Sequence, residues 1–319
     1  MRQAHADPVS SPTVDVLRRA LHIKGSSLVM TLFGDAIAMR AQPIWLSSLI
    51  RLASPFGLSS RLVRTSVYRL VADDWLLAAR EGRRSHYRLT PNGALRVRHA
   101  QRRIYGDDVR ADTAPGSTLL MISADLKASA RQQLQRELVW NGYGELADGV
   151  YAHTRADRSC LQDILRSNRA CDHVCVMQAD LDSTLSKRPL HTLRASRCCP
   201  GRLEQAWRRF IERFSPLQNA CSTLTDHEAF LVRILLVHEF RRILQRQPTL
   251  TPDQHRDEAL THQARRLFEE LYQHLLQPSE RYLDHELASC PALTPARTSA
   301  PWSTDKRSRA PALGQSSLH

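Results

Sequence analysis

Apolar residues recur at helical spacing in three successive segments near the start of the chain, and these segments predict three short helices. The first is expected over residues 27–39 and the second over residues 44–53, with Pro43 between them. Ser59 or Ser60 is expected to cap the third helix. The positions predicted to be buried are Leu28, Leu32, Ala36 and Met39, then Trp45, Leu46, Leu49 and Leu52, then Leu62, Val63, Val67, Leu70 and Val71.

The opposite side of the third helix is basic. It carries Arg61, Arg64, Thr65, Tyr68 and Arg69. Arginine donates two parallel hydrogen bonds, which suits guanine edges and phosphates in the major groove of DNA. A solvated arginine face is the ordinary alternative for such a stripe, so the segment that follows it matters.

A hairpin is predicted directly after this helix. A short apolar run begins at Trp75, Glu81-Gly82 is a turn signal, and residues 85–89 alternate like a strand. The hairpin tip carries Arg80, Arg83 and Arg84. Helix, turn, basic helix and hairpin predict a winged helix-turn-helix over residues 26–110, with the helix in the major groove and the tip on the DNA backbone.

A further helix is expected to begin at Thr90-Pro91, since proline suits the first helical turn. Its predicted inner positions are Leu95, Ala100 and Ile104, and its predicted outer positions are Arg96, Arg98, Arg102 and Arg103. Between residues 76 and 105 there are eight arginines and one acidic residue, which strengthens the prediction of a DNA-binding surface.

The net charge of +13 is concentrated in the first third of the chain. Residues 1–110 carry 18 Lys/Arg against 8 Asp/Glu, whereas residues 111–319 carry 27 against 24. A bias toward arginine in the whole proteome would raise both parts alike, so the asymmetry favours a polyanionic partner, double-stranded DNA.

The cysteines and the apolar segments indicate the cellular compartment of the protein. An odd number of cysteines, no signal peptide and no long apolar run predict a cytoplasmic protein with free thiols and no membrane span.

Strands and helices are predicted to alternate through the middle of the chain, as β-α-β-α-β over residues 115–185. This order indicates a small ferredoxin-like α/β domain. Asp125 follows the first predicted strand, but no second carboxylate has the spacing of a metal-dependent nuclease. Cys171, His173 and Cys175 share one face of a strand, but their spacing matches no standard zinc site. No catalytic residue and no metal site are therefore predicted.

The last third of the chain predicts a helical bundle over residues 200–288. Its three helices are expected over residues 201–214, 225–245 and 257–277, with Asp226 as the cap of the second. Residues 1–25 are expected to be a flexible arm, with VDVLRRAL (residues 14–21) as a candidate short helix. Residues 289–319, rich in Pro, Ser and basic residues, are expected to be a disordered tail.

Three segments resemble one family of bacterial regulators. SLVMTLFGDAIAMRAQPIWLSSLIRLASPFGLSSRLVRTSVYRLVADDWLLAAREGRRSHYRLTPNG resembles the N-terminal domain of PaaX-type repressors, which regulate phenylacetic acid degradation. RELVWNGYGELADGVYAH resembles their middle domain, which is similar to the Cas2 ferredoxin-like fold and is implicated in self-association. AFLVRILLVHEFRRILQRQPTL resembles a helix of their effector-response domain.

The resemblance implies a homodimeric repressor that is released from its operator by phenylacetyl-CoA or a related aryl-CoA. A CoA thioester needs cations for its phosphates, and His238, Arg241 and Arg242 are candidates. The alternative is that both arginines pair with acidic residues on neighbouring helices.

The sequence therefore predicts an α+β multidomain protein, with a winged helix-turn-helix, a ferredoxin-like (Cas2-like) dimerisation domain and a C-terminal helical bundle. It is expected to be a repressor without enzymatic activity and without a cofactor. Three alternatives stay open: an enzyme acting on aryl-CoA thioesters, a Cas2-like nuclease using Asp125, and a nonspecific DNA-binding protein. No nucleophile elbow, paired carboxylates or Gly-rich CoA loop supports the first.

Overall fold

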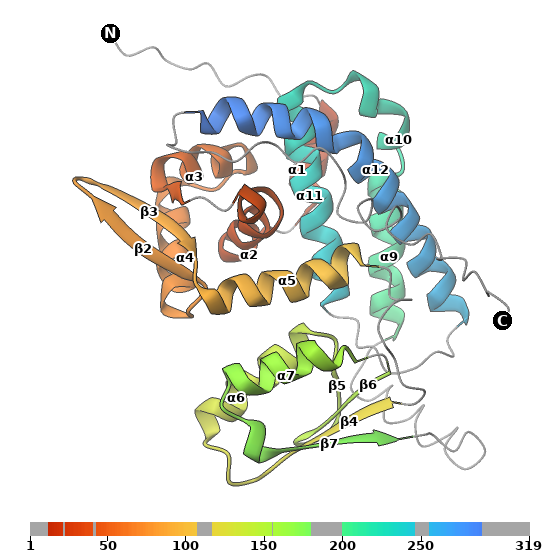
Figure 1. The fold of residues 1–319 in the computed structure, drawn as a ribbon. Coiled ribbons are helices and arrows are strands. Elements are labelled where there is room, and N and C mark those ends of the chain that lie inside the picture. Colours follow the sequence, from red (N-terminus) through yellow and green to blue (C-terminus); the bar gives the residue numbers. More distant parts are fainter. Residues whose placement is uncertain are drawn as a thin grey trace, which may run out of the picture.

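The computed structural model describes residues 12–21, 23–40, 43–106, 117–154, 156–179, 200–245 and 255–288 (Figure 1). The predicted tail over residues 289–319 and the first eleven residues of the predicted arm lie outside these ranges. The first part of the chain contains α1 (Pro12–Ala20), α2 (Gly25–Thr31), the π-helical turn η1 (Leu32–Ile37), η2 (Ala38–Arg40), β1 (Ile44–Trp45), α3 (Leu46–Ala53), η3 (Ser54–Phe56), α4 (Ser60–Ala72), β2 (Leu76–Glu81), β3 (Arg84–Leu89) and α5 (Pro91–Tyr105).

Local sequence signals explain where α4, the hairpin and α5 begin and end. The Ser59 side chain accepts a hydrogen bond from the Leu62 backbone N–H (3.3 Å), and the Thr90 side chain accepts one from the Gly93 N–H (2.8 Å). Gly82 has a φ of +58° at the first central position of the two-residue turn between β2 and β3, which is the place of glycine in a type II′ turn. The predicted order of helix, turn, helix and hairpin is therefore present.

Two details of this part differ from the prediction. The second helix begins at Leu46, because Ile44 and Trp45 form β1 and pair with Tyr87 and His86 of β3. Leu62, predicted to be buried, is 42% exposed, because it lies in the first turn of α4 beside the basic face.

The described part of the arm predicted over residues 1–25 contains the short helix expected there, and this helix is packed against the core instead of being free. Residues 12–20 form α1, which buries Val14 and Leu17 against α11. Arg18 also donates a hydrogen bond to the Pro55 carbonyl (3.1 Å). The apolar residues of α1 recur at helical spacing, so the segment gains stability by covering the core.

The middle domain is an antiparallel sheet with two helices. It contains β4 (Ser117–Ile122), α6 (Ala128–Trp140), β5 (Gly144–Ala147), β6 (Val150–His153), α7 (Arg158–Ser167), η4 (Cys171–His173) and β7 (Val174–Ala179). The strand order β5-β6-β4-β7, with antiparallel neighbours throughout, is that of a ferredoxin-like βαββαβ unit. The ferredoxin-like prediction is confirmed, although β5 was not predicted.

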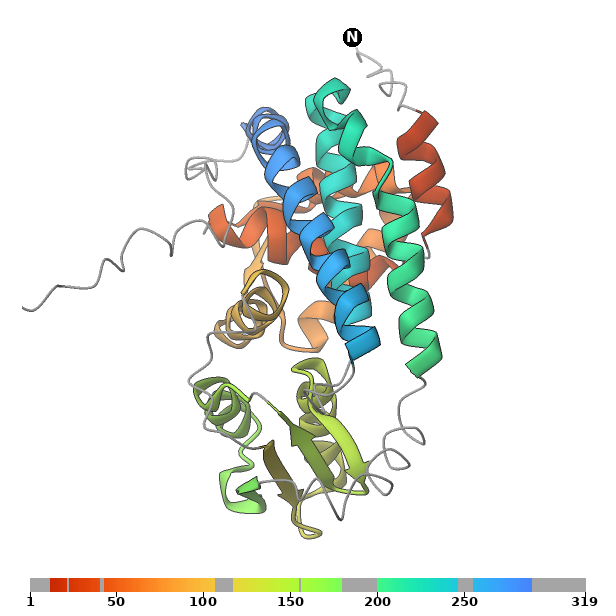
Figure 2. The ribbon, with the colours of Figure 1, turned by 90° about the vertical axis from the view of Figure 1, so that its right-hand side faces the viewer.

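The last part contains α9 (Pro200–Phe214), α10 (Leu217–Ala220), η5 (Cys221–Thr223), α11 (Asp226–Leu244) and α12 (His255–Leu287). Thr225, rather than the predicted Asp226, caps α11, in a capping box with Glu228. The third helix was predicted to end before Pro278, but α12 continues through it and buries Leu283 and Leu287. Figure 2 shows α9, α11 and α12 side by side.

α11 is buried on almost every side because it lies between α9 and α12 on one side and α1 and α2 on the other. As a result, one continuous apolar core joins the first part of the chain to the C-terminal helices. The middle domain has a separate core, built around Leu120, Leu134 and Tyr151. The helices over residues 200–288 therefore share their apolar core with the first part of the chain.

The helices in the described segments include none that is long and apolar enough to cross a membrane.

Candidate nucleic-acid interface and junction pocket

The outer face of α4 presents a continuous polar stripe. Arg61, Arg64, Thr65, Tyr68 and Arg69 are all exposed, and Tyr68 is 76% exposed. The buried side of α4 packs on α2 and α3 and fixes the orientation of the stripe. The structure thus brings together all five helix residues that the sequence predicted for the major groove.

The hairpin beside α4 presents the second predicted set. Arg80, Arg83 and Arg84 are exposed at and next to its tip. The guanidinium carbon of Arg84 lies 5.9 Å from the centroid of the Trp45 ring, which supports the base of the hairpin. Figure 1 shows the hairpin (β2–β3) extending past α4 at the outer edge of the molecule.

Most of these arginines have no polar partner in the described segments. In the part of the chain that the structure describes, no hydrogen bond or ion pair involves the guanidinium groups of Arg61, Arg64, Arg69, Arg80 and Arg83. Solvated guanidinium groups in one stripe repel each other, so an anionic surface is the partner that they suit.

The arginines of α5 have a different role from the one that the sequence suggested. Arg96 is buried, pairs with Glu137 of α6 through its Nε (3.1 Å) and donates to the Asp73 carbonyl (3.1 Å). Arg102 lies 2.7 Å from Asp157, and Arg103 donates to the Trp140 carbonyl (2.8 Å). These three arginines therefore hold the middle domain against α5, and only the outer Arg98 of this helix stays exposed without such a contact.

His238, one of the three effector candidates, is a core residue. The Thr31 hydroxyl donates to the Ser27 carbonyl (3.0 Å), so it accepts from the Nδ1–H of His238 (3.1 Å). Burial, and then the neighbouring Arg241 and Arg242, lower the pKa of His238 to about 3. The imidazole is neutral at physiological pH and cannot serve as a cation for phosphates.

Arg242 pairs with an acidic residue, but on its own helix and not on a neighbouring helix as the alternative held. Its guanidinium lies 3.2 Å from Glu239 on the same helix, and Glu239 also lies 3.6 Å from Arg213 of α9. This group joins α9 to α11.

Arg241 occupies a third kind of environment. It is 6% exposed and donates to the carbonyl and the hydroxyl of Ser27 (3.0 and 2.7 Å). Its guanidinium carbon lies 5.5 Å from the centroid of the Trp140 ring. Burial, and then Arg242, lower the pKa of Arg241 to about 10, so it stays charged at neutral pH.

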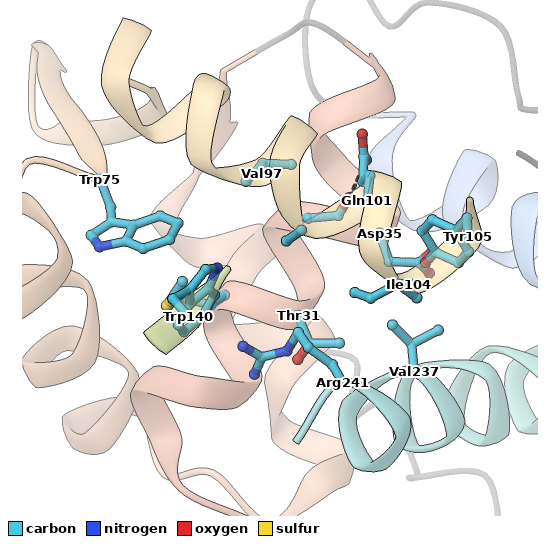
Figure 3. A pocket seen from close by; sticks show the side chains of 13 residues that line it. Thr31, Asp35, Trp75, Val97, Gln101, Ile104, Tyr105, Trp140, Val237 and Arg241 are labelled. Atoms are coloured by element: carbon cyan, nitrogen blue, oxygen red, sulfur yellow. Dashed lines mark hydrogen bonds between the residues drawn. The ribbon is translucent and has the colours of Figure 1, made fainter. Parts of the chain in front are cut away.

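Arg241 lines a small cavity, which we call the junction pocket (Figure 3). The cavity volume is about 30 Å³. Its walls come from four parts of the chain: Met30, Thr31, Gly34 and Asp35 of α2–η1, Trp75, Val97, Ala100, Gln101, Ile104 and Tyr105 of the α4–α5 segment, Trp140 of the middle domain, and Val237 and Arg241 of α11.

One wall of the junction pocket is the centre of a buried ionic network. Asp35 accepts hydrogen bonds from the Tyr105 and Tyr272 hydroxyls (2.5 and 2.7 Å) and lies 2.8 Å from Arg233 of α11. Arg233 pairs in turn with Glu280 of α12 (2.6 Å). Burial alone would lower the pKa of Arg233, but Asp35, and after it Tyr272 and Glu280, outweigh this effect and raise it.

The network extends to η2, since Arg40 lies 2.6 Å from both Glu280 and Asp284. It therefore ties the segment before β1 to α11 and α12. The residues of the network were not predicted, although Asp35 and Arg233 each interrupt an apolar helical run, and a charge there is buried with a partner.

The middle domain presents no cluster of catalytic side chains in the described segments. Asp125 is exposed after β4, and its carboxylate lies 3.2 Å from His173 Nδ1. Hydrogen bonds from Ser123 and His173 lower the pKa of Asp125. Among the described residues, no three His, Cys, Asp or Glu side chains are grouped so as to hold a metal ion.

Comparison with known proteins gives matches along most of the chain. Residues 24–93 match the family described as PaaX-like protein, residues 121–190 match the PaaX protein central Cas2-like domain, and residues 201–285 match the PaaX-like protein C-terminal domain. The transcriptional repressor PaaX of Escherichia coli (strain K12) is 32% identical over 267 residues, covering 80% of this chain and 81% of that protein. Among solved structures, the uncharacterized protein Rv0674 from Mycobacterium tuberculosis aligns with 19% identity and a TM-score of 0.37, over 79% of this chain and 98% of that one.

Proposed function

The chain belongs to the PaaX family of transcriptional repressors, and we propose that it binds operator DNA as a homodimer and is released by phenylacetyl-CoA or a related aryl-CoA. Family membership gives DNA binding and transcriptional repression in phenylacetate catabolism. The DNA-contacting residues, the dimer and the effector are the finer points of the proposal.

The DNA-binding part of the proposal rests on the contrast between the arginines of α5 and the arginines of α4. Arg96, Arg102 and Arg103 on α5 are used in contacts within the protein, whereas the arginines of α4 have no such partners in the described segments. We assign α4 to the major groove, with Arg61, Arg64, Thr65, Tyr68 and Arg69 facing base edges.

We propose that the hairpin contacts the DNA backbone and not the bases. Arg80, Arg83 and Arg84 extend beyond the body of the protein and are placed to contact phosphates beside the groove. Such contacts strengthen binding to every sequence and make it depend on salt.

The dimer is expected to form through the middle domain. This domain has its own core, so it can associate with a second copy without disturbing the core that carries α4. A two-fold dimer presents two copies of α4 to two half-sites, which multiplies specificity.

An enzymatic role is a weaker reading. Asp125 lies on an exposed turn with a histidine beside it, and no second carboxylate completes a metal site in the described segments. Hydrolysis of phenylacetyl-CoA by the purified protein, or DNA cleavage that Asp125→Ala abolishes, would favour the enzymatic reading.

The test is a fluorescence-anisotropy titration of the protein's own upstream DNA with the full-length protein. Arg64→Ala is expected to weaken binding to this DNA by about 1–3 kcal/mol, and binding to random DNA by much less. Arg208→Ala on α9 is the matched control, because Arg208 is exposed and pairs only with Glu204 (2.7 Å) in the described segments. Figure 1 shows α9 and α4 on opposite sides of the molecule. Equal loss on both DNAs would reduce Arg64 to a phosphate contact.

A further inference from the structure

The junction pocket holds a buried cation, Arg241, that has no carboxylate partner in the described segments. Four arginines are buried among the described residues: Arg40, Arg96, Arg233 and Arg241. The first three each contact at least one carboxylate, whereas within the described part of the chain the hydrogen bonds of Arg241 go only to neutral oxygens of Ser27. Its Nε is buried and makes no hydrogen bond. A buried charge without a counter-charge is costly for folding, so the arrangement suits a ligand that brings an oxygen acceptor to Arg241.

The walls beside Arg241 are aromatic. The Trp75 and Trp140 rings lie 5.6 Å apart between centroids, with the Arg241 guanidinium against the Trp140 ring. Figure 3 shows the Arg241 side chain extending toward Trp140, with Trp75 beyond it. Flat aromatic walls and one cation match a ligand that has an aromatic ring and a carboxylate or acyl oxygen close to it.

We propose that the junction pocket is the effector site, and that it takes an aromatic ring carrying an acyl group, with the ring between Trp75 and Trp140 and the acyl oxygen on Arg241. This inference rests on the proposed function, because it names the place where the aryl effector acts.

The size of the cavity shows what binding requires. Its volume is about 30 Å³, whereas a cavity of about 150 Å³ is needed to hold a benzene ring. Trp75 belongs to the α4–β2 connection and Trp140 to the middle domain, so a ring enters only if these two parts separate. The contacts between them suit such opening, because the two sides have separate apolar cores and are joined by polar contacts such as Arg96–Glu137 and Arg103–Trp140.

Separation of Trp75 from Trp140 would reach the DNA-binding helix directly. The Trp75 N–H donates to the Leu70 carbonyl at the end of α4 (2.8 Å), and the Trp75 carbonyl accepts from the Thr90 N–H (3.0 Å). Arg96 lies over the Trp75 ring (5.0 Å) and also binds the Asp73 carbonyl. A ligand that moves Trp75 therefore changes how α4 and the hairpin are held relative to the rest of the dimer. This gives the ligand different affinities for the DNA-binding and open states, as release of the operator requires.

The experiment measures release of labelled upstream DNA from the full-length protein, with phenylacetyl-CoA, phenylacetate and CoA titrated separately. Wild type is expected to respond to phenylacetyl-CoA. Arg241→Gln is expected to need about tenfold to a hundredfold more ligand, the range for loss of a hydrogen bond to a charged group. Trp140→Leu should also need more ligand, and Arg242→Gln is the matched control because Arg242 pairs with Glu239 outside the pocket.

The outcomes separate the two proposals. If wild type responds and Arg241→Gln and Trp140→Leu respond equally well, the pocket assignment is overturned and the proposed function stands. If wild type binds its upstream DNA and none of the three compounds releases it, both the effector and its site are overturned. A response to phenylacetate supports the pocket with the free acid as ligand, whereas an equal response to CoA alone overturns it. If Arg241→Gln does not bind DNA in the absence of ligand, Trp140→Leu decides.

Discussion

The Asp35 carboxylate is expected to be one of the largest single contributors to stability in this protein. Replacing Asp35 by Ala leaves Arg233, which is fully buried, with Glu280 as its one carboxylate partner in the described segments, and removes the acceptor of the Tyr105 and Tyr272 hydroxyls. Breaking a buried ion pair by removing one partner costs about 3–5 kcal/mol. For a chain of 319 residues, with about 2.1 cal/mol/K of unfolding entropy per residue, that loss lowers the melting temperature by roughly 4–8 °C.

Asp226→Ala is the matched control for this measurement. Asp226 also pairs with an arginine, Arg281, at 2.6 Å, but both side chains are largely exposed. An exposed pair contributes about 1 kcal/mol or less, so the control should melt within a few degrees of wild type. Melting is followed by circular dichroism at fixed protein concentration. Equal melting temperatures for the Asp35 and Asp226 variants would refute the claim that the buried network fastens η1 to α11 and α12.

Three further outcomes are expected. Arg64→Ala should lose about 1–3 kcal/mol of affinity for the upstream DNA in an anisotropy titration, while keeping most of its affinity for random DNA; equal losses contradict base reading. Arg83→Ala should weaken binding to both DNAs alike and reduce the slope of log affinity against log salt by about 0.9; an unchanged slope means that Arg83 makes no phosphate contact. The pKa of His238 is about 3 in the folded chain and about 6.5 when unfolded, so between these values the unfolded state binds the extra proton. Stability should therefore fall by about 1.4 kcal/mol per pH unit from this group as pH drops below about 6, and urea unfolding of His238→Asn should show a shallower fall; an equal fall contradicts the neutral buried histidine.

Elements whose boundaries depend on neighbouring residues were predictable from the sequence. The cap at Ser59, the Thr90-Pro91 start of α5 and the turn at Gly82 each act within a few residues, and the structure has them where the sequence placed them. The basic face of α4 was visible for the same reason, since a helix repeats every 3.6 residues.

Features that depend on distant parts of the chain were not predictable. The partners of Arg96 and Arg102 lie 41 and 55 residues away, so the arginines of α5 resembled a DNA-binding surface until their contacts with the middle domain were known. Asp35 and Arg233 are 198 residues apart in sequence. Helical spacing shows which residues are buried, but it does not show which of them pair.

The junction pocket illustrates the same limit. The sequence pattern places Trp75 in the predicted hairpin and Trp140 in a helix of the middle domain. The spacing of apolar residues within these elements does not show that the two rings are in contact. Arg241 was proposed for a ligand together with His238 and Arg242, yet only Arg241 lines the pocket.

One measurement tests the central claim most directly: anisotropy of labelled upstream DNA bound to the full-length protein, at fixed salt, with excess random DNA and then with phenylacetyl-CoA. We expect the complex to survive about a hundredfold excess of random DNA, since specific sites bind at least about a thousandfold more tightly, and to dissociate when the thioester is added. Loss of the complex to random DNA in proportion to its amount would contradict sequence-specific repression, and persistence of the complex in saturating phenylacetyl-CoA would contradict the proposed release.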